Sequence, residues 1–537
     1  MARSTLFDQL RRIVRLGDFA DARGIPSDEA VSEAISLDRR RFLGVAAGAA
    51  GVATVGCADG VSVGAEAIRV RGGRDVAIVG AGIAGVACAY ELQRSGVEAT
   101  LYEASERVGG RMFSAGGAFP GVGDFAGQII ERGGELIDTT HATIKGYARE
   151  LGLTLEDITR DPGEVFYVFG GVRYSEVAVV DEYRAFVPAM RDDLRLISGP
   201  TADAFTPDDA RLDRMSLAEY LDARRPGALI RKVIEVAYNI EYGAEPGDQS
   251  ALAFLQFIHA DRRSKFKPFG IFSDERFHVV EGNQSIPVGL AARLRRQPTL
   301  GHRLLRVRRT ASGQVELTFQ RGARTVTAAH DAVVLALPAP VLRGVELDAS
   351  LALPDWKLRA IRELRYGANT KMMVSFRGRP WAALGGNGAS YNDGRNLQAT
   401  WETAPGSATA SRAVLTNYSG GDLAARIDPR RTAAEASAFL ADLDAVFPGA
   451  SASVRRDPSG APVAHIENWL RNPLCLGAYT ANHPGYFTTI AGNEGKPVGN
   501  LFFAGEHTDS FCEWQGFMEG GAASGVRAAA EVLDLVR

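Results

Sequence analysis

The 537-residue chain has few cysteines and no excess of either charge. Its four cysteines are scattered and show no CxxC or Cys/His spacing, which argues against a disulfide framework and against a metal site. The 61 basic and 64 acidic residues nearly cancel, so the charge gives no indication of a nucleic-acid partner. Apolar and charged contents of 46% and 23% are ordinary for a globular protein, and the length allows two or more domains.

Long apolar runs are also missing, so we expect no stable membrane span. The mildly apolar segment 45–56 is too short for a permanent span, and it follows Arg39-Arg40-Arg41-Phe42-Leu43. Two arginines, a spacer and Phe-Leu resemble a twin-arginine export signal. We therefore expect residues 1–70 to be a leader and the protein to be exported to the periplasm or secreted. The alternative is a cytoplasmic protein with an ordinary N-terminal extension.

A glycine-rich turn follows the first strongly apolar segment. Residues 76–79 read as a buried strand, Gly80, Gly82 and Gly85 form a Gly-x-Gly-x-x-Gly turn, and a helical pattern follows. Such glycines permit a tight turn, a close approach of the backbone to a pyrophosphate, and close packing of helix on strand. Glu103, at the end of the next expected strand, can accept hydrogen bonds from a ribose and would repel a 2′-phosphate. The segment predicts a site for an ADP-containing dinucleotide other than NADP.

A second glycine pair lies just past this acidic residue. Gly109 and Gly110 precede Arg111, whose planar guanidinium could neutralise phosphate charge. A solvated surface arginine is the alternative interpretation.

The apolar pattern changes several times along the chain. Strand–helix–strand patterns with glycine loops occupy three separated pieces, and two inserts lie between them. We expect an α/β protein with a cofactor domain formed by 71–153, 275–345 and 491–537, and a substrate domain formed by 154–274 (mainly helical) and 346–490.

Several motifs occur together, in one order, between about residue 74 and the end of the chain. They are Gly80-Ala-Gly82-Ile-Ala-Gly85, Glu103, Gly109-Gly110-Arg111, Glu131-Arg-Gly-Gly-Glu135, Phe502-Phe-Ala-Gly505-Glu506 and Trp514-Gln-Gly516-Phe517-Met518-Glu-Gly520. This combination resembles the flavin-containing amine oxidases, which include monoamine, polyamine and L-amino-acid oxidases. The resemblance implies FAD and a Rossmann-like FAD-binding domain of the glutathione-reductase type, with a discontinuous substrate domain of mixed sheet and helices.

The resemblance also implies roles for residues near the C-terminus. Gly505 and Glu506 would approach the ribityl or pyrophosphate region of FAD. Gly516, Phe517 and Met518 would begin a helix whose N–H groups face the flavin, where they can stabilise negative charge on the reduced ring. Val307, in an expected strand at 304–308, is counted with the cofactor-binding residues.

Aromatic side chains would enclose the flavin. By the resemblance, Tyr479 and Phe517 form two walls over the ring, with Trp514 beside them; plain core packing is the alternative. Where some monoamine oxidases tether FAD through a cysteine, this chain has Ala478, and Cys475 lies three residues away. We therefore expect noncovalent FAD.

Lys371 is the sharpest single-residue prediction. It lies in the apolar, strand-like run 366–374, where a lysine is costly without a partner. In the family, a lysine in this setting holds a water at flavin N5. The alternative is a lysine at a strand end with its amine in solvent.

The expected reaction is oxidation of a CH–NH2 or CH–NH group to an imine by hydride transfer to flavin N5. Reoxidation by O2 gives hydrogen peroxide, and hydrolysis gives an aldehyde or keto product and ammonia. Because a neutral amine reacts, activity is expected to rise from neutral to alkaline pH. Dimers are usual in this family, so the resemblance suggests a homodimer.

The substrate stays open between an amine and an L-amino acid, with a desaturase or isomerase of the same fold as a further alternative. Venom-type L-amino-acid oxidases place a carboxylate-binding arginine where this chain has Phe113, which favours an amine. Two sets of charged residues remain as candidates: Arg362, Arg365 and Arg471 for a carboxylate clamp, and the Glu235/Glu241 region and Glu513 for a second amine.

Overall fold

The computed structural model describes residues 75–160, 162–258, 273–409, 411–509 and 514–536. The expected leader, with its arginine motif, and Glu513 lie outside the described residues. Within them, no helix combines the length and the apolar character that a bilayer span requires.

A parallel sheet at one end of the molecule brings together three distant parts of the chain. Its strands are β1 (Val76–Val79), β2 (Ala99–Tyr102), β12 (Ala332–Leu335) and β21 (Leu501–Phe503), in the order β2-β1-β12-β21. All three pairings are parallel. Strands β1, β12 and β21 are buried at every position, as parallel strands usually are, whereas the edge strand β2 is half-buried at Thr100 and Tyr102.

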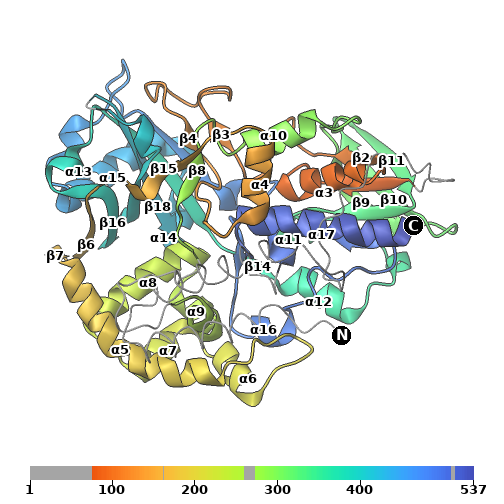
Figure 1. The fold of residues 1–537 in the computed structure, drawn as a ribbon, viewed down its shortest axis with the longest axis horizontal. Helices are drawn as coiled ribbons and strands as arrows, with labels where there is room; N and C mark the ends of the chain where they lie inside the picture. The colour runs from red at the N-terminus through yellow and green to blue at the C-terminus, as the bar shows by residue number, and fades with distance from the viewer. Residues whose placement is uncertain (1–74, 161, 259–272, 410, 510–513, 537) are drawn as a thin grey trace, which may run out of the picture.

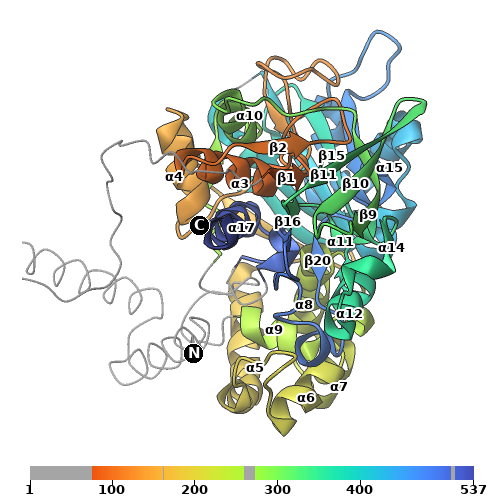
Figure 2. The ribbon, with the colours of Figure 1, turned by 90° about the vertical axis from the view of Figure 1, so that its right-hand side faces the viewer.

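The two faces of β1 show how this sheet is covered. Val76 and Ile78 pack against helices α3 (Ile83–Arg94) and α17 (Met518–Val536), whereas Ala77 and Val79 face a second sheet. Figures 1 and 2 show α3 and α17 side by side on one face of the parallel sheet and β9 and β10 on the other. The fold is therefore the Rossmann-like α/β fold expected from the sequence.

The second sheet is antiparallel apart from its short edge strand. It contains β9 (Arg303–Arg309), β10 (Val315–Arg321), β11 (Arg324–His330) and β13 (Glu346–Leu347), in the order β11-β10-β9-β13. Its inward side chains, among them Val307, Leu317 and Phe319, pack onto the parallel sheet.

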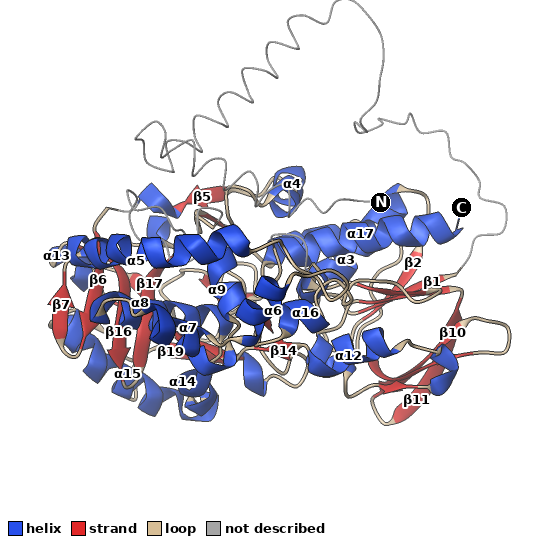
Figure 3. Cartoon of the chain, turned by 90° about the horizontal axis from the view of Figure 1, so that it is seen from below, coloured by secondary structure: helices blue, strands red, loops and turns tan. Residues whose placement is uncertain are grey.

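A seven-stranded sheet forms the centre of the other half of the molecule (Figures 1 and 3). Its strands, in the order β19-β15-β18-β17-β16-β6-β7, are β6 (Glu164–Phe169), β7 (Val172–Tyr174), β15 (Asn369–Phe376), β16 (Gly386–Gly394), β17 (Leu397–Thr403), β18 (Ala413–Gly420) and β19 (Ala464–Asn468). Besides helices, the segment 154–274 contributes β6 and β7 to this sheet. The sequence signal for β6 is the continuous apolar run 165–169, which is typical of a strand covered on both faces.

Helices cover both faces of the seven-stranded sheet. Phe166 and Val168 pack with α15 (Thr432–Val446), whereas Tyr167 and Phe169 pack with a helical cluster. This cluster comprises α5 (Glu176–Leu196), α6 (Pro207–Arg214), α7 (Leu217–Arg224), α8 (Ala228–Tyr242) and α9 (Ala251–Phe257). The C-terminal end of α8 reaches the boundary between the two halves of the molecule.

Shorter elements complete the described chain. They are β3 (Ser114–Ala115), β4 (Ile130–Glu131), α4 (Ala142–Glu150), β5 (Leu155–Asp157), β8 (Phe277–Val279), α10 (Ser285–Ala292), α11 (Ala339–Leu342), α12 (Asp355–Glu363), β14 (Arg365–Tyr366), α13 (Pro380–Ala383), α14 (Gly421–Arg426), β20 (Thr480–Ala481) and α16 (Tyr486–Thr489).

Candidate active site

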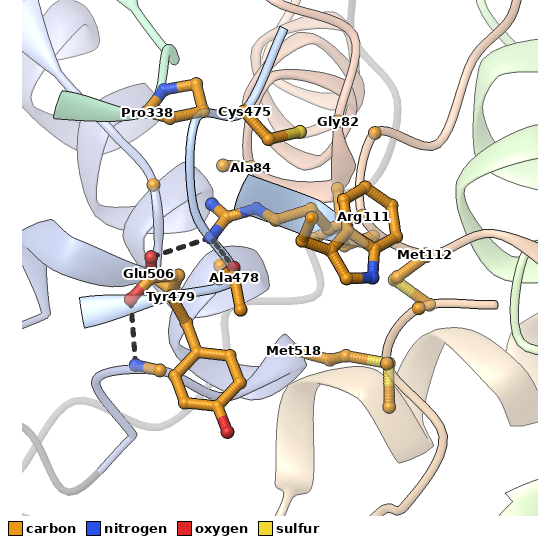
Figure 4. A pocket seen from close by; sticks show the side chains of 18 of the residues that line it. Gly82, Ala84, Arg111, Met112, Pro338, Cys475, Ala478, Tyr479, Glu506 and Met518 are labelled. Carbon is orange, nitrogen blue, oxygen red and sulfur yellow. Dashed lines mark hydrogen bonds and ion pairs between the residues drawn. The ribbon is translucent and has the colours of Figure 1, made fainter. Parts of the chain in front are cut away.

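A cavity of about 630 Å³ is lined by residues of both halves of the molecule. All but two of the site residues predicted from the sequence line it. The predicted residues that line the cavity are Gly80, Gly82, Glu103, Gly109, Gly110, Arg111, Lys371, Tyr479, Gly505, Glu506, Trp514, Gly516, Phe517 and Met518. The two exceptions are Gly85 and Val307. Figure 4 shows part of this wall, with Arg111, Tyr479, Glu506 and Met518 around one space.

The first glycine loop is shaped by close backbone contacts. Gly80 has φ +106°, and a Cβ there would lie 2.5 Å from the carbonyl oxygen of Ala336. A Cβ on Gly85 would lie 1.9 Å from the carbonyl oxygen of Gly80, so this glycine holds α3 against β1 rather than lining the cavity. Helix α3 begins after Gly82 without a side-chain cap, and its first residues face the cavity. Its free N–H groups and its dipole favour an anionic ligand there.

Glu103 is held in one orientation beside this loop. Its Oε2 accepts a hydrogen bond from the Ala81 N–H at 2.7 Å, and its Oε1 accepts from the N–H and the Oγ of Ser105, both at 2.8 Å. The carboxylate still lines the cavity, so it can accept a hydrogen bond from a ribose hydroxyl.

Arg107, which the sequence reasoning did not single out, carries a buried atom that calls for a ligand. Its Nη2 donates to the Gly110 carbonyl at 2.7 Å, but among the described residues its buried Nη1 has no hydrogen-bond partner. An unpaired buried guanidinium N–H is costly, and the residue lines the cavity near Glu103. Together with the uncapped start of α3, this orphaned donor fits a bound dinucleotide.

Arg111 and Glu506 tie three segments of the wall together. Arg111 Nη1 donates to the Ala478 carbonyl at 2.7 Å and to Glu506 Oε1 at 2.9 Å (Figure 4). Glu506 Oε2 accepts from the Gly516 N–H and from Thr480 Oγ1, both at 2.9 Å. Burial opposes ionisation of Glu506, but Arg111, His507 and a hydrogen bond from Tyr366 together outweigh it and keep the pKa of this carboxyl below its usual value. The pair thus fixes the segments that carry Tyr479 and Phe517.

Lys371 has the partner that its burial requires. On β15 it stands opposite Tyr418 of β18 and Glu467 of β19, so the three occupy one row across the sheet. Its Nζ donates to Glu135 Oε2 at 2.5 Å and to the Gly133 carbonyl at 3.0 Å. The two side chains are only 4% and 6% exposed. Because an ammonium has three N–H donors, one remains for a ligand or a water in the cavity.

Aromatic side chains surround this lysine. Its Nζ lies 5.5 Å from the ring centroid of Trp401, and the Trp401 ring meets Tyr418 edge-on at 5.2 Å. The Tyr418 and Tyr479 hydroxyls are 2.9 Å apart. Both Trp401 and Tyr418 line the cavity and were not predicted. No local sequence signal marks them, because which side chains of β17 and β18 face the cavity depends on how these strands pair.

Trp514 and Phe517 stand at another part of the wall. Their rings meet edge-on at 6.1 Å, and both contact the buried ring of His141. Glu519, the next acidic residue, caps helix α4 by accepting from the N–H groups of Thr143 and Ile144. The C-terminal motif therefore also positions the loop that carries His141.

Three further carboxylates line the cavity away from the glycine loop: Asp138, Glu241 and Glu275. Burial, with a smaller contribution from Asp138, raises the pKa of Glu241 to about 8. Burial and the neighbouring Glu241 raise the pKa of Glu275 to about 8 as well. Without a neighbouring cation, both carboxyl groups therefore keep their protons at neutral pH.

Several candidates lie elsewhere. Val307 points into the core between two sheets, and the cavity is lined instead by Arg303, Leu304 and Leu305 at the start of β9. Val307 lies two residues beyond the last of these along β9. The possible clamp residues Arg362, Arg365 and Arg471 are exposed and outside the lining. Glu235 is paired with Arg231 and is also outside it.

Phe113, at the position where some oxidases have a carboxylate-binding arginine, is stacked between two guanidinium groups. Arg107 and Arg132 lie 3.6 and 3.7 Å from its ring centroid. Arg132 is itself paired with Glu467 at 2.7 Å. Of these two arginines, Arg132 is thus committed to an ion pair, and Arg107 lies toward Glu103 and the glycine loop. No set of three or more His, Cys, Asp or Glu in the described chain is arranged to hold a metal ion.

Comparison with known proteins gives a consistent result. Residues 83–533 match the family model described as flavin containing amine oxidoreductase. The chain is 28% identical to a Mycobacterium tuberculosis protein assigned as flavin-containing monoamine oxidase AofH, over 86% of this chain and 97% of that protein. It is 26% identical to the flavin-dependent L-tryptophan oxidase RebO of Lentzea aerocolonigenes, over 85% and 98%. In fold it is similar to cyclohexylamine oxidase from Brevibacterium oxydans, with a TM-score of 0.72 and 23% identity over 87% of this chain and 100% of that one.

Proposed function

We propose that this chain, which belongs to the family of flavin-containing amine oxidoreductases, oxidises the CH–NH2 or CH–NH group of an amine to an imine, with O2 as the electron acceptor. FAD is the cofactor of the family, and the buried donors described above fit it. The observation that carries the proposal is a single cavity that contains a dinucleotide loop, a buried lysine and an aromatic wall. A binding protein without catalysis would not need a lysine buried at the cost of a dedicated ion pair.

The chain's own residues position each part of the reaction. Glu103, Arg107 and the start of α3 would hold the ADP half of FAD, and the start of α17 would face the flavin. Bound FAD would supply the hydride acceptor and the route for electrons to O2, which gives hydrogen peroxide. Tyr479 and Phe517 would orient the amine and exclude bulk water. Lys371, fixed by Glu135, would hold a water or a proton at the reacting end.

An amine is favoured over an α-amino acid by the charges in the cavity. A free carboxylate would need a guanidinium, but Phe113 occupies the expected place, and Arg132 is committed to Glu467. Glu241 and Glu275 offer a carboxylate no cation to pair with and would repel it when ionised. L-amino-acid oxidation stays the second candidate, because RebO, an L-tryptophan oxidase, matches over nearly its whole length.

One experiment tests the proposal on the purified holoenzyme. Amines and both enantiomers of amino acids are mixed with it without oxygen, and bleaching of the flavin absorbance is followed. Release of hydrogen peroxide in air is measured in parallel. Bleaching and peroxide with amines support the proposal, and reaction with L-amino acids alone favours the second candidate. No bleaching with any of these compounds refutes an oxidase of this class.

Noncovalent FAD is proposed as well, because Ala478 precedes the wall residue Tyr479. Burial raises the pKa of the nearby Cys475 to about 11, so its thiol is not ionised at neutral pH. Acid precipitation is expected to release all of the flavin into the supernatant. Flavin that stays in the pellet would contradict this.

Export is the remaining proposal, and it rests on the Arg39-Arg40 motif. Replacing both arginines by lysine is expected to keep the protein in the cytoplasmic fraction. Unchanged export of this variant would contradict the proposed signal.

A further inference from the structure

We propose that the amine substrate carries a second, protonated amino group and that Glu241 and Glu275 form the subsite for this distant charge. This inference rests on the proposed function and specifies its substrate class as diamines or longer polyamines. The subsite belongs to the same cavity as Lys371 and Tyr479.

The two carboxylates reach the cavity from different elements. Glu241 is the penultimate residue of α8, and Glu275 lies two residues before β8. Asp138 fixes the Glu275 backbone by accepting its N–H at 2.7 Å and also accepts from Ser273 Oγ at 3.3 Å. Asp138 is thus a positioning residue, and the Glu275 side chain stays available to a ligand.

The other acidic side chains of the cavity already have partners. Glu135 is paired with Lys371, Glu467 with Arg132, and Glu506 with Arg111. Glu103 accepts three hydrogen bonds from Ala81 and Ser105. Against this pattern, Glu241 and Glu275 form no hydrogen bond or ion pair through their carboxylates with any described residue.

Ionising two carboxyl groups in a confined cavity is costly when no described residue supplies a cation, and burial raises the pKa of each to about 8. A ligand ammonium would remove this cost by forming charge-assisted hydrogen bonds. The C-terminal end of α8 adds to the attraction, because helix C-termini carry partial negative charge. The chemistry of the subsite therefore selects a cation.

The subsite also lies beside the aromatic wall. The Tyr479 hydroxyl donates to the carbonyl of Ile240, the residue before Glu241, at 3.3 Å. Glu241 and Glu275 both lie close enough to Tyr479 to contribute to raising the pKa of its hydroxyl. A flexible chain can therefore present one neutral amino group at the wall while a second, charged one reaches the carboxylates.

The test compares α,ω-diaminoalkanes with n-alkylamines of equal chain length on the wild-type holoenzyme. The ratio of kcat/KM for the diamine to that for the monoamine is measured for each length. We expect the ratio to exceed about tenfold at the best length, since hydrogen bonds to charged groups contribute that much or more. L-lysine and L-ornithine form a further arm and are expected to be poorer than the diamines.

Substitutions of Glu241 and Glu275 test whether these two residues cause the preference for diamines. Glu241→Gln and Glu275→Gln are each expected to lower the diamine-to-monoamine ratio by about 10–100-fold. Glu235→Gln is the matched control, because Glu235 lies on the same helix but is paired with Arg231 outside the cavity. It should keep the wild-type ratio. Non-oxidisable bis-quaternary alkanes should also inhibit wild-type enzyme better than mono-quaternary ones, a measurement that needs no variant.

The outcomes separate this inference from the proposed function. Flavin reduction by monoamines and diamines with equal kcat/KM would overturn the subsite and leave an amine oxidase. The subsite would also be overturned if the two Gln substitutions left the diamine-to-monoamine ratio unchanged. A preference for L-lysine or L-ornithine over the diamines would overturn it as well. If no amine bleaches the flavin, both the subsite and the proposed function fail.

Discussion

The Lys371–Glu135 pair should behave as one unit whose halves cannot be removed separately. Both side chains are nearly inaccessible, and the ammonium and carboxylate are 2.5 Å apart. Breaking a buried ion pair from one side costs about 3–5 kcal/mol, because an uncompensated charge stays behind. For Glu135→Gln we expect about 3 kcal/mol, since the Gly133 carbonyl still accepts from Lys371. For Lys371→Met we expect the upper part of that range, because Glu135 loses its ammonium altogether.

The double variant Lys371→Met/Glu135→Leu distinguishes this reasoning from simple loss of contacts. Replacing both partners by apolar side chains of similar volume is often close to neutral. We therefore expect the double variant to be more stable than either single variant, with a coupling energy of about 3 kcal/mol or more. Urea unfolding at fixed free FAD, followed by tryptophan and by flavin fluorescence, measures it. Additive losses would refute the paired-charge account and would leave Lys371 as an ordinary buried side chain.

Three further perturbations test other parts of the site. Gly85→Ala places a Cβ 1.9 Å from the Gly80 carbonyl and should cost about 1–3 kcal/mol and weaken FAD retention, whereas Gly146→Ala, with open space around it, should be neutral or stabilising. Glu506→Gln leaves Arg111 without its carboxylate and should raise the dissociation constant of FAD about tenfold or more; retention equal to wild type would contradict this. The pKa of Glu241 is raised from 4.5 to about 8, so its contribution to stability is present below pH 4.5 and is lost as pH rises to about 8. Without substrate, Tm should therefore fall over that range, and Glu241→Gln should flatten the profile.

The sequence predicts those parts of the site whose role depends on the conformation of a short segment of chain. Gly80 and Gly85 are glycines because a neighbouring carbonyl leaves no room for a Cβ, and such constraints appear directly in the sequence. Lys371 could be identified because a lysine in an apolar strand needs a partner. Its partner, Glu135, comes from a loop 236 residues away, and no local pattern connects the two.

The remaining parts depend on how distant segments meet. Trp401 and Tyr418 face the cavity only because β17 and β18 pair in one register, which the sequence does not specify. Asp138 and Glu275 come together through a backbone hydrogen bond across 137 residues. Val307 differs, because its side chain lies in the core between the two sheets. The segment was correctly expected to be a strand, but only the beginning of β9 reaches the cavity, and each further residue moves about 3.3 Å along the strand.

The charges that line the cavity bear on the choice of substrate, because a buried carboxylate needs a partner that compensates its charge. A buried carboxylate persists when a guanidinium, an ammonium or several N–H groups neutralise it, and Glu135, Glu467, Glu506 and Glu103 all satisfy this condition. When members of a family share a cofactor but act on different substrates, the residues that differ between them must be ones that do not bind the cofactor. Glu241 on α8 and Glu275 before β8 lie outside the elements that would hold the ADP half of FAD, and within the described chain neither carboxylate has an ion pair. Their charge is therefore free to select a ligand, whereas the charges of the paired residues are needed to keep the cavity folded.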